Sequence, residues 1–195
     1  MLHYNPLEVS SVTYPWCFNK NYFTALECKE IIKYCSSLTK QKATVFNEDS
    51  QTITKRFSDI AWVEYNEDSK WFYDKLALGI DSLNQKFYQF DLTGFQNLQF
   101  TEYNSLDKAK YDWHMDIVLG HNTNSLTRKL SATLLLNDEF EGGDFEFFDF
   151  EKQNQPCMPI GSLIVFPSFM THRVMEVTKG VRNSLVCWCV GPKFK

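Results

Sequence analysis

Residues 111–116 read Tyr-Asp-Trp-His-Met-Asp and lie in a half of the chain that is rich in short strand-like segments. His114 and Asp116 are two residues apart, so on a β-strand both side chains would point to one face. An imidazole and a carboxylate that converge in this way form two corners of a metal site. The third corner must come from elsewhere, and the remaining histidines are His3, His121 and His172.

The pattern from residue 98 onward is typical of an antiparallel sandwich or barrel, because short apolar segments alternate with Gly and Pro. We expect strands over 98–103, 111–118, 128–137, 145–150, 162–166, 172–177 and 182–190. Turns are expected at 141–144 and at 179–180. In the strand over 128–137, alternation places four apolar side chains on one face: Leu130, Ala132, Leu134 and Leu136.

The first half of the chain predicts a helical layer. Thr24 and Glu27 fit a capping box at the start of a helix that ends near Leu38. The apolar stripe of this helix repeats at helical spacing and consists of Cys28, Ile31, Ile32 and Cys35. A second helix is expected from residue 68 or 69 to about 90, with Gly79 as a tolerated weak point. Its predicted buried side consists of Phe72, Leu76, Ile80, Leu83 and Phe87. Residues 11–18, 42–47 and 52–63 are expected to be extended.

Length and composition favour one folded domain over residues 1–195. Of the 195 residues, 44% are hydrophobic and 16% aromatic, which supports a well-buried core. We interpret residues 1–97 as helical and strand support and residues 98–195 as the metal-binding core. The predicted fold class is mainly β with supporting helices (α+β).

Charge and targeting signals narrow the classes of partner. The formal charge of −4 gives no basic footprint and argues against a nucleic-acid partner. The sequence has no apolar run long enough to span a membrane and no secretory signal, so we expect a cytoplasmic protein without a membrane partner. The six cysteines are then expected to be reduced, buried thiols. A zinc site at Cys28 and Cys35 is an alternative, but their spacing fits one face of a helix better.

His172 is the preferred third ligand. It begins a predicted strand, and several antiparallel strands separate it from Asp116, so the fold can bring the two together. Two histidines and one carboxylate form a facial triad that is characteristic of non-haem Fe(II) oxygenases. His121 lies in a polar stretch, 121–125, that indicates a loop. The competing interpretation is that each histidine is an ordinary hydrogen-bonded strand residue.

Arg182 strengthens the metal interpretation. It is expected on the strand after His172, with Ser184, Val186 and Trp188 on the same face. A guanidinium on an apolar inward face is costly unless a carboxylate meets it, and its planar fork binds a carboxylate with two hydrogen bonds. A dicarboxylic cosubstrate that reaches from the metal to Arg182 would satisfy it. The alternative is an arginine at the surface end of a strand.

These pieces together resemble the 2-oxoglutarate- and Fe(II)-dependent dioxygenases, specifically their prolyl 4-hydroxylase-like branch. The resemblance covers about half of the chain. It rests on the ordered set Leu-Gln-Phe-Thr-Glu-Tyr (98–103), Tyr-Asp-Trp-His-Met-Asp (111–116), Arg-Lys-Leu-Ser-Ala-Thr (128–133), Glu-Gly-Gly-Asp-Phe (141–145), Gly-Ser-Leu-Ile-Val-Phe-Pro-Ser (161–168), Thr-His-Arg-Val (171–174) and Lys-Gly-Val-Arg-Asn-Ser-Leu-Val (179–186).

The resemblance implies a double-stranded β-helix, or jelly roll, with the iron at one open end. His114, Asp116 and His172 take the iron-ligand positions. Arg182 takes the position that pairs with the distal carboxylate of 2-oxoglutarate. Collagen-type enzymes carry lysine at the position of Arg182, so the resemblance argues against a collagen-like substrate.

The resemblance also implies a pocket around the cosubstrate. Tyr103 matches a tyrosine that hydrogen-bonds 2-oxoglutarate, and Thr133 and Leu135 should line the same pocket. Leu135 falls where some relatives have a second tyrosine, so that contact is expected to be absent. Tyr111 and Trp188 match positions near the iron and the substrate mouth. The segments 104–110 and 121–125 are expected to flank that mouth as lids.

The implied activity is hydroxylation of a prolyl residue in a peptide or protein, coupled to decarboxylation of 2-oxoglutarate to succinate and CO₂. Fe(II), 2-oxoglutarate and O₂ are the implied cofactor and cosubstrates, with ascorbate as an optional reductant. One alternative is a hydroxylase of a free amino acid or other small-molecule substrate. A second is oxidative nucleic-acid demethylation, against which the acidic charge argues. A third is a non-catalytic jelly-roll binding module, against which the complete triad and Arg182 argue. The sequence predicts neither the identity of the substrate nor the oligomeric state.

Overall fold

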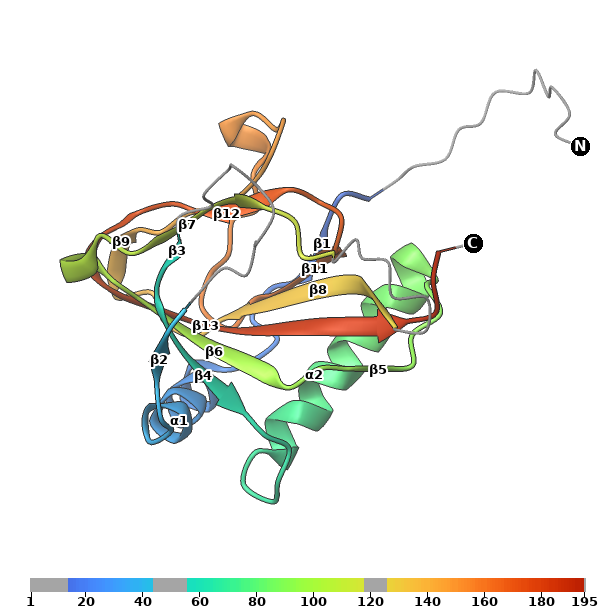
Figure 1. The fold of residues 1–195 in the computed structure, drawn as a ribbon, viewed down its shortest axis with the longest axis horizontal. Coiled ribbons are helices and arrows are strands. Elements are labelled where there is room, and N and C mark those ends of the chain that lie inside the picture. Colours follow the sequence, from blue (N-terminus) through green and yellow to red (C-terminus); the bar gives the residue numbers. More distant parts are fainter. Residues whose placement is uncertain (1–13, 44–55, 118–125, 195) are drawn as a thin grey trace, which may run out of the picture.

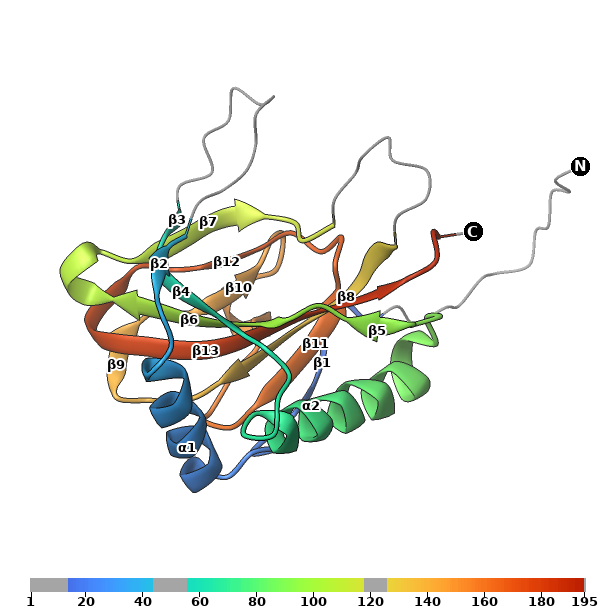
Figure 2. The ribbon, with the colours of Figure 1, turned by 60° about the horizontal axis from the view of Figure 1, so that its bottom comes forward.

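The computed structural model describes residues 14–43, 56–117 and 126–194. Two antiparallel sheets face each other, and both helices cover the outer side of the larger sheet (Figures 1 and 2). Histidines His3 and His121, the loop over 121–125 and most of the strand predicted over 42–47 lie outside the described residues.

The strands pair in two separate sheets. The larger sheet has the order β1-β11-β8-β13-β6-β4-β2, with β5 and β9 also paired to β13, and the smaller has the order β10-β12-β7-β3. The larger sheet comprises β1 (Cys17–Asn19), β2 (Gln41–Lys42), β4 (Asp59–Val63), β5 (Gly94–Phe95), β6 (Leu98–Asn104), β8 (Thr127–Leu135), β9 (Phe140–Gly142), β11 (Leu163–Pro167) and β13 (Val177–Gly191). The smaller comprises β3 (Arg56–Phe57), β7 (Lys110–His114), β10 (Phe145–Phe147) and β12 (His172–Val174).

Helix α1 (Ala25–Ser36) begins at the predicted capping box, which is confirmed. The Thr24 side chain accepts a hydrogen bond from the Glu27 backbone N–H, and the Glu27 carboxylate accepts one from the Thr24 N–H at 2.7 Å. These bonds satisfy N–H groups that the first turn of a helix leaves unpaired. Cys28, Ile31 and Cys35 are buried, as the apolar stripe predicts.

Helix α2 (Lys70–Leu83) is shorter than predicted and continues as a π-helical turn, η1 (Asn84–Tyr88). Gln89 follows with a φ of 54°, and the Asn84 side chain exchanges two hydrogen bonds with the Phe90 backbone. This local closure ends the helix before Phe90. Gly79 is not simply a weak point, because it faces Tyr22 and Leu163 at close range.

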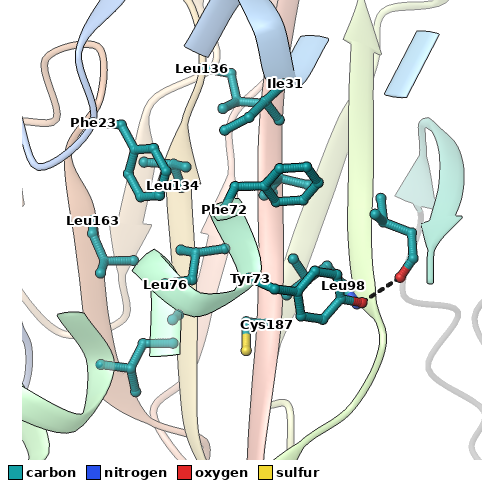
Figure 3. Close-up of a cluster of buried hydrophobic side chains, with 14 of the residues drawn as sticks. Phe23, Ile31, Phe72, Tyr73, Leu76, Leu98, Leu134, Leu136, Leu163 and Cys187 are labelled. Atoms are coloured by element: carbon teal, nitrogen blue, oxygen red, sulfur yellow. Dashed lines mark hydrogen bonds between the residues drawn. The ribbon is translucent and has the colours of Figure 1, made fainter. Parts of the chain in front are cut away.

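The main core lies between the two helices and the larger sheet, where side chains from both meet (Figure 3). Phe72 and Leu76 of α2 pack there with Leu134 of β8 and Leu163 of β11. Tyr73 is also buried, and its hydroxyl donates to the Val63 carbonyl at 2.5 Å (Figure 3). The helices therefore hold the larger sheet from one side only, which leaves its other face free to build a site against the smaller sheet.

Strand β13 corrects one prediction. Residues 179–180 do not form a turn, because β13 runs unbroken from Val177 to Gly191. Gly180 has a φ of 73°, and a Cβ there would lie 2.6 Å from the Glu139 carbonyl oxygen. A glycine can adopt this left-handed conformation and so bend the strand without ending it. The residues that link the smaller sheet to the larger one instead precede Val177.

Candidate metal centre

The two sequence-predicted histidines of the triad lie directly opposite each other in the smaller sheet. His114 ends β7 and His172 begins β12, and the two are paired across these antiparallel strands. The carboxylate of Asp116 faces both, with its oxygens 3.8 Å from Nε2 of His114 and 3.6 Å from Nε2 of His172. All three candidate ligand atoms lie within 4.8 Å of one another.

Asp116 reaches this position in a different way from the one predicted. The strand that was expected over 111–118 ends at His114, so Asp116 is not the next inward residue of a regular strand. The backbone N–H groups of Asp116 and Ile117 both donate to the Ser168 carbonyl at 2.9 Å. Ser168 in turn shares a 3.0 Å hydroxyl contact with Ser131. The chain is therefore bent around Ser168, and the carboxylate turns toward the histidines.

Each histidine ring is oriented by its own backbone neighbourhood. Nδ1 of His114 lies 2.8 Å from the Asp112 carbonyl, and Nδ1 of His172 lies 2.9 Å from the Met170 carbonyl. A carbonyl oxygen only accepts, so each Nδ1 carries the proton in these contacts. Each Nε2 then presents its lone pair to the centre, which is the arrangement that a metal-binding histidine needs.

The electrostatics favour the ligand forms of these side chains. Burial, followed by the neighbouring His172, lowers the pKa of His114 to about 3, which keeps its imidazole neutral. Burial alone would raise the pKa of Asp116, but His172, His114, Ser131 and Trp188 outweigh it and bring the pKa below its usual value. A neutral imidazole beside an ionised carboxylate is a donor set for a divalent cation.

A pocket between the two sheets leads from this centre to Arg182. Arg182 lies on β13, is 2% exposed, and donates from Nη1 to Ser184 Oγ at 3.2 Å. It forms no salt bridge with an acidic residue in the described part of the chain. Burial lowers its pKa below the usual value for arginine. A buried guanidinium without a paired carboxylate is the feature expected of an anion-binding group.

Most of the other predicted site residues line the same pocket. Tyr103 is the cross-strand partner of Arg182 on β6, and Thr133 lies on β8. The ring of Tyr111 stacks on His114 with centroids 3.5 Å apart. Trp188 is buried and also lines this pocket. Leu135 differs, because it lines an adjoining cavity behind Arg182 and not the metal pocket.

Sequence reasoning missed two polar residues of the pocket wall, Arg56 and Gln99. Gln99 could have been found by alternation, since it shares a face of β6 with Tyr103. Arg56 had a weaker signal, because its strand was predicted but the pairing of β3 with β7 was not. The expected lid over 104–110 includes the short helix η2 (Ser105–Asp107), and none of its residues lines the pocket.

None of the helices in the described part of the chain combines the length and apolar character that a membrane crossing requires.

The second half of the chain is similar to known proteins of one superfamily. Residues 98–190 match the model of the 2OG-Fe(II) oxygenase superfamily. A PKHD-type hydroxylase from Xylella fastidiosa (strain 9a5c) is 38% identical over 91 residues, which cover 42% of this chain and 40% of the relative. The chain thus aligns with less than half the length of this curated relative.

Solved structures share the fold over most of the chain. A prolyl-4-hydroxylase from Pseudomonas putida has a TM-score of 0.71 at 22% identity and covers 92% of this chain and 94% of its own. A prolyl hydroxylase from Trichoplax adhaerens, solved with a hypoxia inducible factor peptide fragment, has a TM-score of 0.69 at 18% identity, with coverages of 90% and 83%. The predicted jelly roll, mainly β with supporting helices, is confirmed.

Proposed function

We propose that the protein is a 2-oxoglutarate- and Fe(II)-dependent dioxygenase, because residues 98–190 match the model of the 2OG-Fe(II) oxygenase superfamily. Its substrate in this proposal is a prolyl residue of a peptide or protein. The observation that carries the proposal is one pocket that joins a His-Asp-His centre to a buried arginine. The solved structures named as prolyl hydroxylases, which share the fold, support the choice of substrate.

The residues present fit an Fe(II) ion. His114, Asp116 and His172 would hold it through two imidazole nitrogens and one carboxylate oxygen, the donor set of non-haem iron oxygenases. Both Nδ1 atoms already face carbonyl oxygens, so neither ring must turn to offer Nε2. Second contacts of this kind keep metal-binding rings in place.

The residues also fit a dicarboxylate. Arg182 would bind the distal carboxylate of 2-oxoglutarate, which supplies the negative charge that its buried guanidinium lacks. Tyr103 and Thr133 stand beside it in the pocket and would contribute hydroxyl groups. Leu135 lines the adjoining cavity and has no polar atom in its side chain, so it offers no further hydrogen bond to the dicarboxylate.

When bound, Fe(II), 2-oxoglutarate and O₂ supply an oxidative decarboxylation to succinate and CO₂ that is coupled to oxygen insertion into a C–H bond. The protein positions the reactants and excludes water. Phe145, Phe166 and Val174 form apolar walls of the pocket and keep water from the centre. Tyr111 packs flat on His114 and fixes one ligand ring from the side.

A cytoplasmic location is part of the proposal. All six cysteines are free thiols, and five of them are buried. Unpaired thiols are typical of a reducing compartment.

Anaerobic titration with Fe(II) and 2-oxoglutarate tests the proposed centre. We expect a metal-to-ligand charge-transfer absorption in the visible range that His172→Ala abolishes and that His121→Ala leaves intact. With O₂ and proline-containing peptides, mass spectrometry should find products heavier by one oxygen atom and an equal amount of succinate. Absence of the absorption would overturn the cofactor assignment, and iron affinity that His172→Ala leaves unchanged would overturn the ligand assignment. Oxygenation of free amino acids but of no peptide would overturn the substrate class.

A further inference from the structure

Arg56 is a cation of the metal pocket that the proposed cofactors leave without a role. It comes from β3, ahead of the residues that match the family model, and lines the same pocket as the triad and Arg182. Strand β3 pairs with β7 so that Arg56 lies opposite Tyr111. The guanidinium lies over the Tyr111 ring at 4.6 Å, and that ring stacks on His114.

The side chain of Arg56 is held in place by neutral groups. Its Nε donates to Ser58 Oγ at 3.0 Å and its Nη2 to Gln99 Oε1 at 2.7 Å. None of the acidic residues that the structure describes forms a salt bridge with it. Asp107, in an adjoining groove that Arg56 also lines, pairs with Lys42 at 3.2 Å. The guanidinium of Arg56 is thus oriented beside the metal centre. Its charge is not compensated by any acidic residue in the described part of the chain.

The formal charges of the pocket and of the proposed cofactors balance without Arg56. Asp116 is the one carboxylate among the described residues that line the pocket. With the proposed cofactors bound, the doubly positive iron and Arg182 would be balanced by Asp116 and the two carboxylates of 2-oxoglutarate. The positive charge of Arg56 then has no counter-ion among these groups. A partly buried, pre-oriented guanidinium gains most from a carboxylate that can accept two hydrogen bonds.

We propose that Arg56 binds a carboxylate of the substrate, so that the preferred prolyl substrate carries an acidic group close to the target proline. The inference rests on the proposed function and adds a charge requirement to it. The carboxylate has two possible sources in a peptide, an Asp or Glu side chain near the proline or the α-carboxylate of a C-terminal proline. Arg56 is a specificity-determining residue in this scheme and takes no part in the oxygen chemistry.

Arg173 offers a matched control. It also lies on a strand that flanks β7 and covers an aromatic ring of β7, with its guanidinium 4.2 Å from the Trp113 ring. It differs in that Glu146 already pairs with it through bonds of 2.8 and 2.6 Å, and it does not line the metal pocket. Arg173→Gln therefore removes an arginine–aromatic contact of the same kind without touching the proposed substrate charge site.

The experiment measures binding before turnover. Capped peptides with a central proline, in which a single aspartate is moved from position to position, are titrated against wild type, Arg56→Gln, Arg56→Lys and Arg173→Gln with Mn(II) and 2-oxoglutarate present. The same peptides with asparagine serve as neutral partners. A further arm compares a C-terminal proline with a free acid or an amide, and free proline itself.

We expect at least one aspartate position, or the free terminal acid, to bind about tenfold more tightly than its neutral partner, a ratio typical of a charge-assisted bidentate pair. Arg56→Gln should abolish this ratio while neutral peptides bind within about twofold of wild type. Arg56→Lys should retain part of it, and Arg173→Gln all of it.

Other outcomes overturn the inference. If Arg56→Gln weakens acidic and neutral peptides alike and also shifts the Fe(II)–2-oxoglutarate absorption, Arg56 only positions Tyr111 and His114. If acidic peptides show no advantage at any position, the charge requirement is wrong even when neutral peptides are hydroxylated. If the absorption and all turnover are absent, it is the proposed function that fails, and the binding ratios are then read separately.

Discussion

The two histidines of the candidate metal centre are oriented by the same kind of local hydrogen bond. In each, Nδ1 faces the backbone carbonyl of the residue two positions earlier, Asp112 for His114 and Met170 for His172. This hydrogen bond needs no distant partner, so a short stretch of sequence is enough to orient each ring. What the stretch cannot do is bring the rings together, and this depends on the pairing of β7 with β12.

The buried cysteines are expected to be unreactive in the native protein. Burial raises the pKa of Cys17 and Cys28 to about 11 and that of Cys35 to about 12. Because the thiolate is the reactive form, a thiol with a pKa near 11 is ionised to only about one part in a thousand at pH 8. Cys157 is exposed. Iodoacetamide at pH 8 should therefore label Cys157 in the native protein and the other five only after unfolding.

Peptide mass mapping after a timed reaction checks this labelling pattern, and Cys157→Ser is the control that should leave the native protein unlabelled. Labelling of the buried cysteines should become faster as the pH rises, because their raised pKa keeps the thiols protonated until the pH approaches that value. Labelling of Cys28 or Cys35 in the native protein at a rate similar to Cys157 would contradict the buried positions that the structure gives them.

At the level of helices and strands, alternation predicted faces well and boundaries less well. Leu130 and Leu134 of β8 face the helices, while Thr133 faces the pocket, as the period of two requires. The end of β7 was misplaced because the bend at Asp116 depends on Ser168, which is distant in sequence. The turn expected at Gly180 was wrong because a glycine signal does not distinguish a bend within a strand from a reversal.

Gly79 of α2 tests how an element packs. An alanine in a helix is ordinarily favoured over glycine by about 1 kcal/mol. Here a Cβ would lie 2.7 Å from Cε1 of Tyr22 and 2.8 Å from Cδ2 of Leu163, and overpacking of this kind costs about 1–3 kcal/mol. We expect the steric cost to win, so Gly79→Ala should lower the free energy of unfolding by about 1 kcal/mol.

Urea denaturation followed by circular dichroism measures this change. Gly94→Ala is the matched control, because no heavy atom lies within 4 Å of a Cβ at that position, and its effect should stay within about 0.5 kcal/mol. A Gly79→Ala variant as stable as helix propensity alone predicts would show that Tyr22 and Leu163 yield without cost, and that α2 can shift on the sheet.

For the whole molecule, the site is a product of two sheets facing each other. The triad belongs to the smaller sheet and the segment that follows β7, whereas Arg182, Tyr103 and Thr133 belong to the larger one. The sequence motifs predicted both groups separately. The wall formed by Arg56 could not be predicted in the same way, because a two-residue strand carries too little pattern to reveal which strand it pairs with.

This division predicts how ligands stabilise the fold. Mn(II), a redox-stable substitute for iron, should bind the smaller sheet, and 2-oxoglutarate should then join it to Arg182 on the larger sheet. A ligand that binds only the native state at 100 times its dissociation constant stabilises it by about 2.7 kcal/mol. For a protein of this size that is a rise of roughly 5–10 °C in Tm. We expect this rise for 2-oxoglutarate only when Mn(II) is present.

Thermal unfolding with different ligands and variants distinguishes binding at the metal from binding at Arg182. Pyruvate keeps the oxoacid group but lacks the distal carboxylate, so it should add little to the Tm reached with Mn(II) alone. Arg182→Gln should lose the increment from 2-oxoglutarate and keep the one from Mn(II), because only the larger sheet is altered. Asp116→Asn should lose both, and Arg173→Gln neither. If 2-oxoglutarate raised the Tm of Arg182→Gln as much as that of wild type, the dicarboxylate would not reach β13, and the stabilisation would come from the metal end alone.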